Sequence, residues 1–94
     1  MFHTLTMRGA EGFIEWGYQC AAHVTAWTVT RGDSGLTLTG TVTQLNSFRL
    51  SQVPLTFRVP RQNGPWIRTI RDLQIADGGA LTATLVPQES QHGP

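Results

Sequence analysis

Lysine is absent from this 94-residue sequence, and charged residues of all kinds make up only 14% of it. Ordinary soluble domains carry about 25% charged residues. All seven cationic side chains are arginines, and the formal net charge is +1. Without lysine the chain cannot form the phosphate-binding loop of P-loop nucleotide hydrolases, so that class of enzyme is excluded.

Cysteine is also scarce, because Cys20 is the only one and cannot form a disulfide within the chain. We therefore expect the fold to be stabilised by burial of apolar side chains alone, as suits a reducing compartment. No basic segment followed by an apolar stretch opens the sequence, which predicts no signal peptide. No apolar run approaches the roughly 20 residues that cross a bilayer, so we predict no membrane partner.

Threonine, in contrast, is abundant, and its spacing carries the clearest structural signal. From Leu36 to Thr43, aliphatic residues and one glycine alternate with threonines. A period of two places the aliphatic side chains on one face of a strand and the threonines on the other. The segment predicts a half-buried strand. The turn residues 31–35 predict a five-residue hairpin loop that joins it to a preceding strand at 24–30.

The same alternation predicts further strands along the chain. Leu55–Val59 is a short strand between two prolines, which cannot donate to a ladder. Residues 66–75 predict one strand with a bulge at Arg71–Asp72, where the alternation breaks. Residues 81–85 predict the last strand.

The first 22 residues are less regular. Segments 4–8 and 13–16 predict two short strands, and residues 18–23 are compatible with a helical turn.

Short strands separated by turns predict an all-β fold, namely a small single-domain barrel or compact sandwich of about five to seven short antiparallel strands. We expect this domain to span residues 1–86, followed by a flexible C-terminal tail at residues 87–94. The bulky side chains available to fill the interior are Trp16, Trp27, Phe48, Phe57 and Trp66.

Few residues suggest catalysis or metal binding. Cys20 and His23 have the spacing of two metal ligands, but structural zinc sites normally use more than one cysteine. His23, Asp33 and Ser34 provide the residue types of a nucleophilic triad, yet none lies in a nucleophile motif, and a turn accounts for the last two.

Two carboxylates, Glu11 and Glu15, lie four residues apart. Gly12 and the strand-like pair that follows it argue against a helix that would bring them together, so we interpret them as solvated surface. We accordingly predict no catalytic residue, no metal site, no cofactor and no small-molecule substrate. The protein is predicted not to be an enzyme.

The middle of the chain is the most basic part, because residues 40–71 contain five arginines and no acid. Arg58 is expected to point away from the Phe57 face of its strand, and Arg68, beside Trp66, is expected to share that outer surface. Together with Arg49 these are the predicted binding residues. Arginine and tryptophan are enriched at protein interfaces, which favours a protein partner or self-association.

Two alternatives remain open for the arginines. Guanidinium groups also pair with phosphate, so single-stranded nucleic acid on a barrel face is a possible partner, although it would need exposed aromatic platforms. In a chain without lysine, arginines are also needed simply for solubility.

Three stretches carry a resemblance to known proteins: FRLSQVPLTF at 48–57, Gly64–Trp66, and GALTATL at 79–85. Over about residues 24–87 the chain resembles small uncharacterised proteins of tailed phages and prophages from GC-rich bacteria. The resemblance implies a virion or phage-accessory β-domain without a known cofactor, located in the cytoplasm or in the virion. We therefore predict a non-enzymatic, phage-related structural or assembly module that works through its surface. The alternative is a nucleic-acid-binding small β-barrel with an arginine-rich face.

Overall fold

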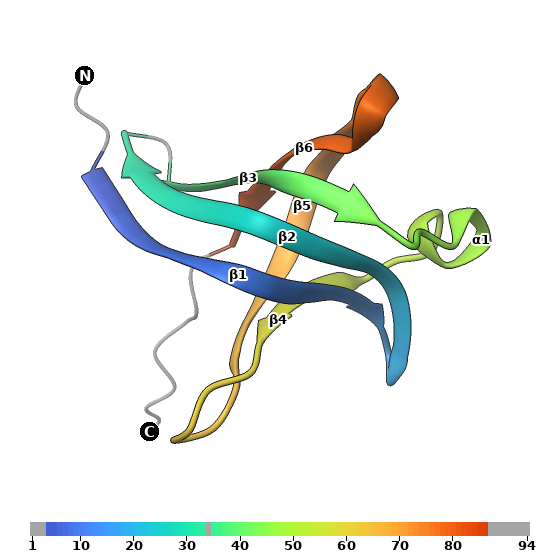
Figure 1. Cartoon of the computed structure of the whole chain (residues 1–94), viewed down its shortest axis with the longest axis horizontal. Coiled ribbons are helices and arrows are strands. Elements are labelled where there is room, and N and C mark those ends of the chain that lie inside the picture. The colour runs from blue at the N-terminus through green and yellow to red at the C-terminus, as the bar shows by residue number, and fades with distance from the viewer. Residues whose placement is uncertain (1–3, 34, 87–94) are drawn as a thin grey trace.

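A computed structural model describes residues 4–33 and 35–86 of the chain, and these form a closed, six-stranded barrel (Figure 1). The elements are β1 (Thr4–Trp16), β2 (Gln19–Gly32), β3 (Gly35–Thr43), α1 (Ser47–Leu50), β4 (Leu55–Val59), β5 (Trp66–Ile75), a 3-10 turn at Asp77–Gly79, and β6 (Ala80–Leu85). The predicted all-β fold is confirmed, as a barrel rather than a sandwich. The predicted tail at 87–94 lies outside the described residues.

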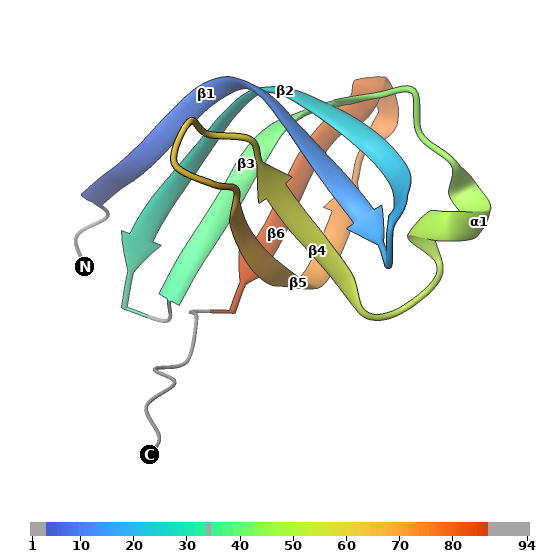
Figure 2. The same cartoon turned by 90° about the horizontal axis from the view of Figure 1, so that it is seen from below.

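Two three-stranded meanders make the barrel, and α1 lies in the connection between them (Figure 2). The strand order is β1-β2-β3-β6-β5-β4, and every neighbouring pair is antiparallel. The barrel closes where β4 pairs with β1. Strands β4, β1, β2 and β3 therefore follow the spatial order of a Greek key.

The two-residue period correctly predicted which side chains enter the core. On β3, Leu36, Leu38 and Val42 are buried while the threonines between them face outward. The same alternation holds on β4 and β6, whose inward residues are Leu55, Phe57, Val59, Leu81, Ala83 and Leu85. Strand β4 pairs with β1 on one side and with β5 on the other. Pro54 and Pro60, which flank it, lie just beyond the paired residues.

Register shifts interrupt three of the strand pairs, namely β1–β2, β2–β3 and β5–β6. The predicted bulge on β5 is present, because the β5–β6 register shifts between Arg71 and Gln74, and Asp72 has a φ of 54°. A second bulge lies on β2, where Ala26 has a φ of 49° and the register with β3 shifts. This bulge lets both Val24 and Trp27 face the interior.

Three local predictions were wrong. The hairpin loop at 31–35 is shorter than expected, because the β2–β3 ladder continues to the pair Gly32 and Gly35. Segments 4–8 and 13–16 form one continuous strand, β1, since β2 pairs along its whole length. Residues 19–23 belong to β2 rather than to a helical turn. In each case pairing with a neighbouring strand overrides the local tendency to turn.

The helix α1 was not predicted, and Phe48, which was expected in the core, lies on it with 67% of its surface exposed. The side chain of Asn46 caps this helix by accepting a hydrogen bond from the Arg49 backbone N–H at 3.0 Å. The helix has no buried residue. It therefore holds Phe48 outside the barrel.

The core is organised around the indole ring of Trp27. Its Nε1 donates a 2.8 Å hydrogen bond to the backbone carbonyl oxygen of Glu11, and its ring meets Phe57 edge to face at 5.3 Å between centroids. Two glycines of β1 give these rings room. A Cβ on Gly9 would lie 2.5 Å from Cζ2 of Trp27, and one on Gly12 would lie 2.6 Å from Cε1 of Phe57.

We expect Gly12→Ala to lower the free energy of unfolding by about 1–3 kcal/mol, because the new methyl group would lie 2.6 Å from a ring carbon of Phe57 and would overpack the core there. Urea denaturation followed by tryptophan fluorescence measures the loss. Phe57→Leu removes the ring that the methyl group would meet, so Gly12→Ala should cost less in that background. Equal losses in the two backgrounds would show that the contact with Phe57 is not the cause.

Candidate functional site

The four predicted binding residues lie in three different places. Arg58 is on the outer wall of β4, Arg49 is on α1, and Trp66 and Arg68 are on the inward-facing side of β5. The prediction that Arg68 shares an outer surface with Arg58 is therefore wrong. The arginine-rich middle of the sequence does not form one basic face.

Strand pairing explains the position of Arg68. Directly opposite residues of an antiparallel pair point to the same side, and Arg68 lies opposite the buried Phe57. The Arg68 guanidinium stacks on the Trp66 ring at 4.3 Å from the centroid and donates a 2.8 Å hydrogen bond to the Ile67 carbonyl oxygen. Burial lowers the pKa of Arg68. The side chain therefore covers one end of the aromatic core.

Arg58 belongs to a row of side chains that crosses the outer wall. Phe13 on β1 lies directly between Arg58 on β4 and His23 on β2. The Arg58 guanidinium lies 5.0 Å from the Phe13 ring centroid, and the His23 ring stacks on Phe13 at 5.0 Å with an interplanar angle of 9°. Both faces of the Phe13 ring are thus occupied, and it offers no free platform on which a nucleic-acid base could stack.

Glu15 is the ion-pair partner of Arg58. Both Nε and Nη2 of Arg58 lie 2.9 Å from Oε2 of Glu15, and this hydrogen bonding is the main reason why the pKa of Arg58 is raised. The Glu15 side chain is only 17% exposed. It is therefore a structural partner rather than the solvated surface residue that the sequence suggested.

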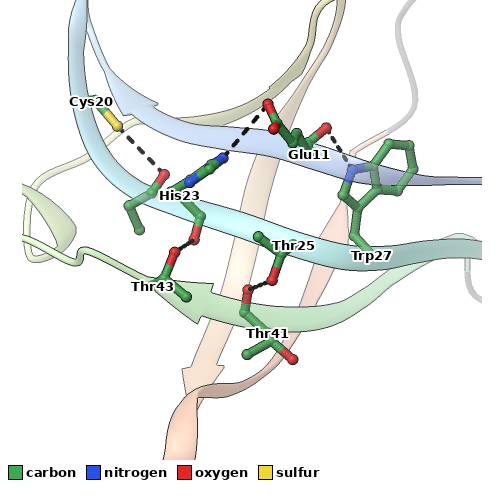
Figure 3. A network of polar contacts seen from close by, with 8 residues as sticks. Glu11, Cys20, His23, Thr25, Trp27, Thr41 and Thr43 are labelled. Carbon is green, nitrogen blue, oxygen red and sulfur yellow. Dashed lines mark hydrogen bonds and ion pairs between the residues drawn. The ribbon is translucent and has the colours of Figure 1, made fainter.

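The next part of the wall is joined by weaker polar contacts (Figure 3). Glu11 lies 3.9 Å from Nε2 of His23, while its backbone carbonyl holds Trp27. Thr43 and Thr25 donate to the backbone oxygens of His23 and Thr41 at 3.4 and 3.5 Å. Within residues 4–33 and 35–86, no three His, Cys, Asp or Glu side chains gather as metal ligands would.

Apolar side chains gather instead at the end of the barrel that carries α1. Val53 is 82% exposed, Phe48 is 67% exposed, Tyr18 is fully exposed, and the Trp16 and Phe48 rings meet edge to face at 6.3 Å. Figures 1 and 2 both show α1 and the β1–β2 turn on the same side of the barrel. We call this surface the α1-end patch, and define it as Trp16, Tyr18, Leu45, Phe48 and Val53.

Arg49 fixes this patch to the barrel. Its Nη1 donates a 3.1 Å hydrogen bond to the Cys20 carbonyl oxygen at the start of β2, and the Asn46 backbone N–H donates to the Ala21 carbonyl oxygen at 2.7 Å. Of the four predicted binding residues, Arg49 is the one that borders the patch. The sequence signal for α1 was the capping residue Asn46, in a segment without a two-residue period.

No protein-family model matches the chain, and no curated protein or solved structure matches it either. Among the described residues, no helix has the length and apolar character needed to cross a membrane.

We expect Glu15→Gln to lower the free energy of unfolding by about 0.5–1 kcal/mol, because it leaves the Arg58 guanidinium without its charged partner. Chemical denaturation at low and high salt measures this loss, which should shrink as salt screens the pair. Glu11→Gln is the matched control, since that side chain is 64% exposed and lies 3.9 Å from its nearest ionisable partner. A loss at Glu11 as large as that at Glu15 would contradict the assignment.

Proposed function

We propose that the protein is a non-enzymatic interaction module that binds another protein through the α1-end patch, as a structural or assembly component of a phage-related particle. The observation that carries this proposal is the exposure of several large apolar side chains at one end of a barrel whose own core is already filled. Contiguous exposed apolar surface, when it occurs in soluble domains, marks sites of protein interaction.

The composition of the patch supports a protein partner. Its aromatic residues, Trp16, Tyr18 and Phe48, are of the types enriched at interface centres and at positions that contribute most to binding free energy. The one charged residue that borders it, Arg49, already donates to a backbone carbonyl. A partner that leaves the Arg49 guanidinium in contact with water can therefore cover the apolar side chains without burying an uncompensated charge.

The patch is also held in place before any partner arrives. The Asn46 cap, the Arg49 hydrogen bond and the Asn46–Ala21 backbone bond fix α1 on β2. Because α1 is already ordered, binding would lose less conformational entropy than binding by a mobile loop. This favours recognition at α1 over recognition at a surface that must first fold.

The phage context rests on the resemblance over residues 24–87, and a cytoplasmic or virion-associated location belongs to the same proposal. The low charge of the chain fits such a role, because a weakly charged surface costs less free energy to bury against neighbouring subunits.

A nucleic-acid-binding role receives less support from the geometry. Arg58 is paired with Glu15, Arg68 lies against Trp66 on the inward side, and the Phe13 ring is covered on both faces. A single-stranded oligonucleotide is nevertheless the natural second probe. Binding that weakens steeply with salt would favour this alternative over a protein partner.

We expect the intact chain to associate with itself or with a protein encoded beside it. Association is measured by sedimentation velocity and by co-expression with the products of the neighbouring genes. Phe48→Ser should weaken it at least about tenfold, because it removes a central aromatic anchor.

Ile67→Ser is the matched control, because Ile67 is a 44% exposed apolar residue on β5, outside the patch. It should leave association unchanged. A chain that stays monomeric at all concentrations and binds none of the neighbouring products would refute the proposal, as would association that Phe48→Ser does not affect.

A further inference from the structure

Strand β1 has an unpaired edge. It pairs with β2 from Thr4 to Trp16, but with β4 only from Phe13 to Trp16. Among the described residues, no strand pairs with the other edge of Thr4–Gly12. Figure 1 shows the β4–β5 hairpin diverging from this half of β1. An edge of nine residues is long enough to accept a further strand.

Pro60 explains why β4 leaves β1. If the β1–β4 register continued beyond Phe13 and Arg58, Glu11 would lie opposite Pro60. Proline has no N–H to donate to a ladder, and the chain then turns back at 61–64, where the Gly64 N–H donates to the Arg61 carbonyl oxygen at 3.1 Å. The position that β4 vacates is therefore left open.

A groove of about 510 Å³ occupies this position. Its walls are residues 7–11 of β1 and residues 59–61 at the end of β4 and just after it, and Trp27 contributes to its lining. Both the inward residues Met7 and Gly9 and the outward residues Arg8 and Glu11 border it. The groove thus follows the backbone edge of β1, and we call it the β1-edge groove.

The charges at the groove favour an acidic occupant. Arg8 and Arg61 are exposed on its two walls, and within the described residues neither forms an ion pair. The one carboxylate at the groove, Glu11, faces His23 (Figure 3). A side chain opposite Arg8 would therefore meet an available cation.

A second copy of the chain fits this edge poorly. Antiparallel pairing of two Thr4–Gly12 edges over their full length places Arg8 opposite Arg8, and like charges in that position destabilise a strand pair. The same arginine that opposes self-pairing would attract a carboxylate. The edge therefore discriminates between its own copy and an acidic strand.

We propose that the β1-edge groove binds an extended segment of another protein by strand addition. In this segment apolar side chains alternate with polar ones, and an acidic residue lies opposite Arg8. The apolar side chains lie on the side of Met7 and Val59, and the backbone continues the β2–β1 ladder. This surface is separate from the α1-end patch, and the inference does not depend on the function proposed for that patch.

The probe is a labelled nine-residue peptide with valine at every second position, serine between them, and glutamate at the centre. Its binding to the full chain is measured by fluorescence anisotropy. We expect it to bind roughly three- to tenfold more tightly than the same peptide with a central lysine. Arg8→Glu should reverse this preference, and Phe48→Ser should leave it unchanged. In hydrogen exchange, bound peptide should protect backbone amides within Thr4–Gly12.

Three results would overturn the inference. Two of them are equal affinity for the glutamate and lysine peptides and no binding of either peptide. The third is binding without new protection of the β1 amides, which would place the peptide elsewhere on the barrel. Salt-dependent binding of a single-stranded oligonucleotide that competes with the peptide and is lost in Arg8→Glu would instead assign the groove to nucleic acid.

Discussion

The burial of one indole ring constrains much of this barrel. Trp27 can enter the core only because the β2 bulge at Ala26 turns it inward, and because Gly9, Gly12 and Gly40 leave the space that it fills. Its N–H would be buried without a partner if the Glu11 carbonyl did not accept it at 2.8 Å. Two of these glycines and the carbonyl belong to β1. The path of β1 is thus fixed by the ring that it covers.

The lengths of the strands determine where a backbone edge of the barrel has no neighbouring strand. β4 has five residues between two prolines, whereas β1 and β2 have 13 and 14. So short a strand can close the barrel over only four pairs with β1, and no other strand among residues 4–33 and 35–86 pairs with the remaining edge of β1. The connection that precedes β4 contains α1 and carries Phe48 and Val53 into solvent. The β1-edge groove therefore lies at the end of β4, and Phe48 and Val53 of the α1-end patch lie before its start.

The sequence predicted the features that are local in the chain. Alternation placed Leu36–Thr43 and Leu55–Val59 correctly, and its interruption located the bulge at Arg71–Asp72, because each depends only on adjacent residues. The exposure of Phe48 depends on α1 lying outside the barrel, which hydrophobicity alone does not show. The prediction for Arg68 was wrong because it followed the charge of the side chain. Arg68 lies two residues before Ile70 on the same strand, and this spacing puts both side chains on the inward side.

The outer wall of the barrel differs from the two candidate surfaces in how many ion pairs and ring contacts its side chains make with one another. On the wall, Arg58 is paired with Glu15, and Phe13 is stacked between Arg58 and His23, so a partner would have to break existing contacts to bind there. In the α1-end patch Phe48 and Val53 are largely exposed, and in the β1-edge groove neither Arg8 nor Arg61 forms an ion pair within the described residues. They lie at different parts of β1, and the segment between them is paired on both sides, by β2 and by β4. Because that segment is held on both sides, occupation of one surface should leave the geometry of the other unchanged, and the two binding free energies should add. If both proposals hold, the module would bind two different partners at once.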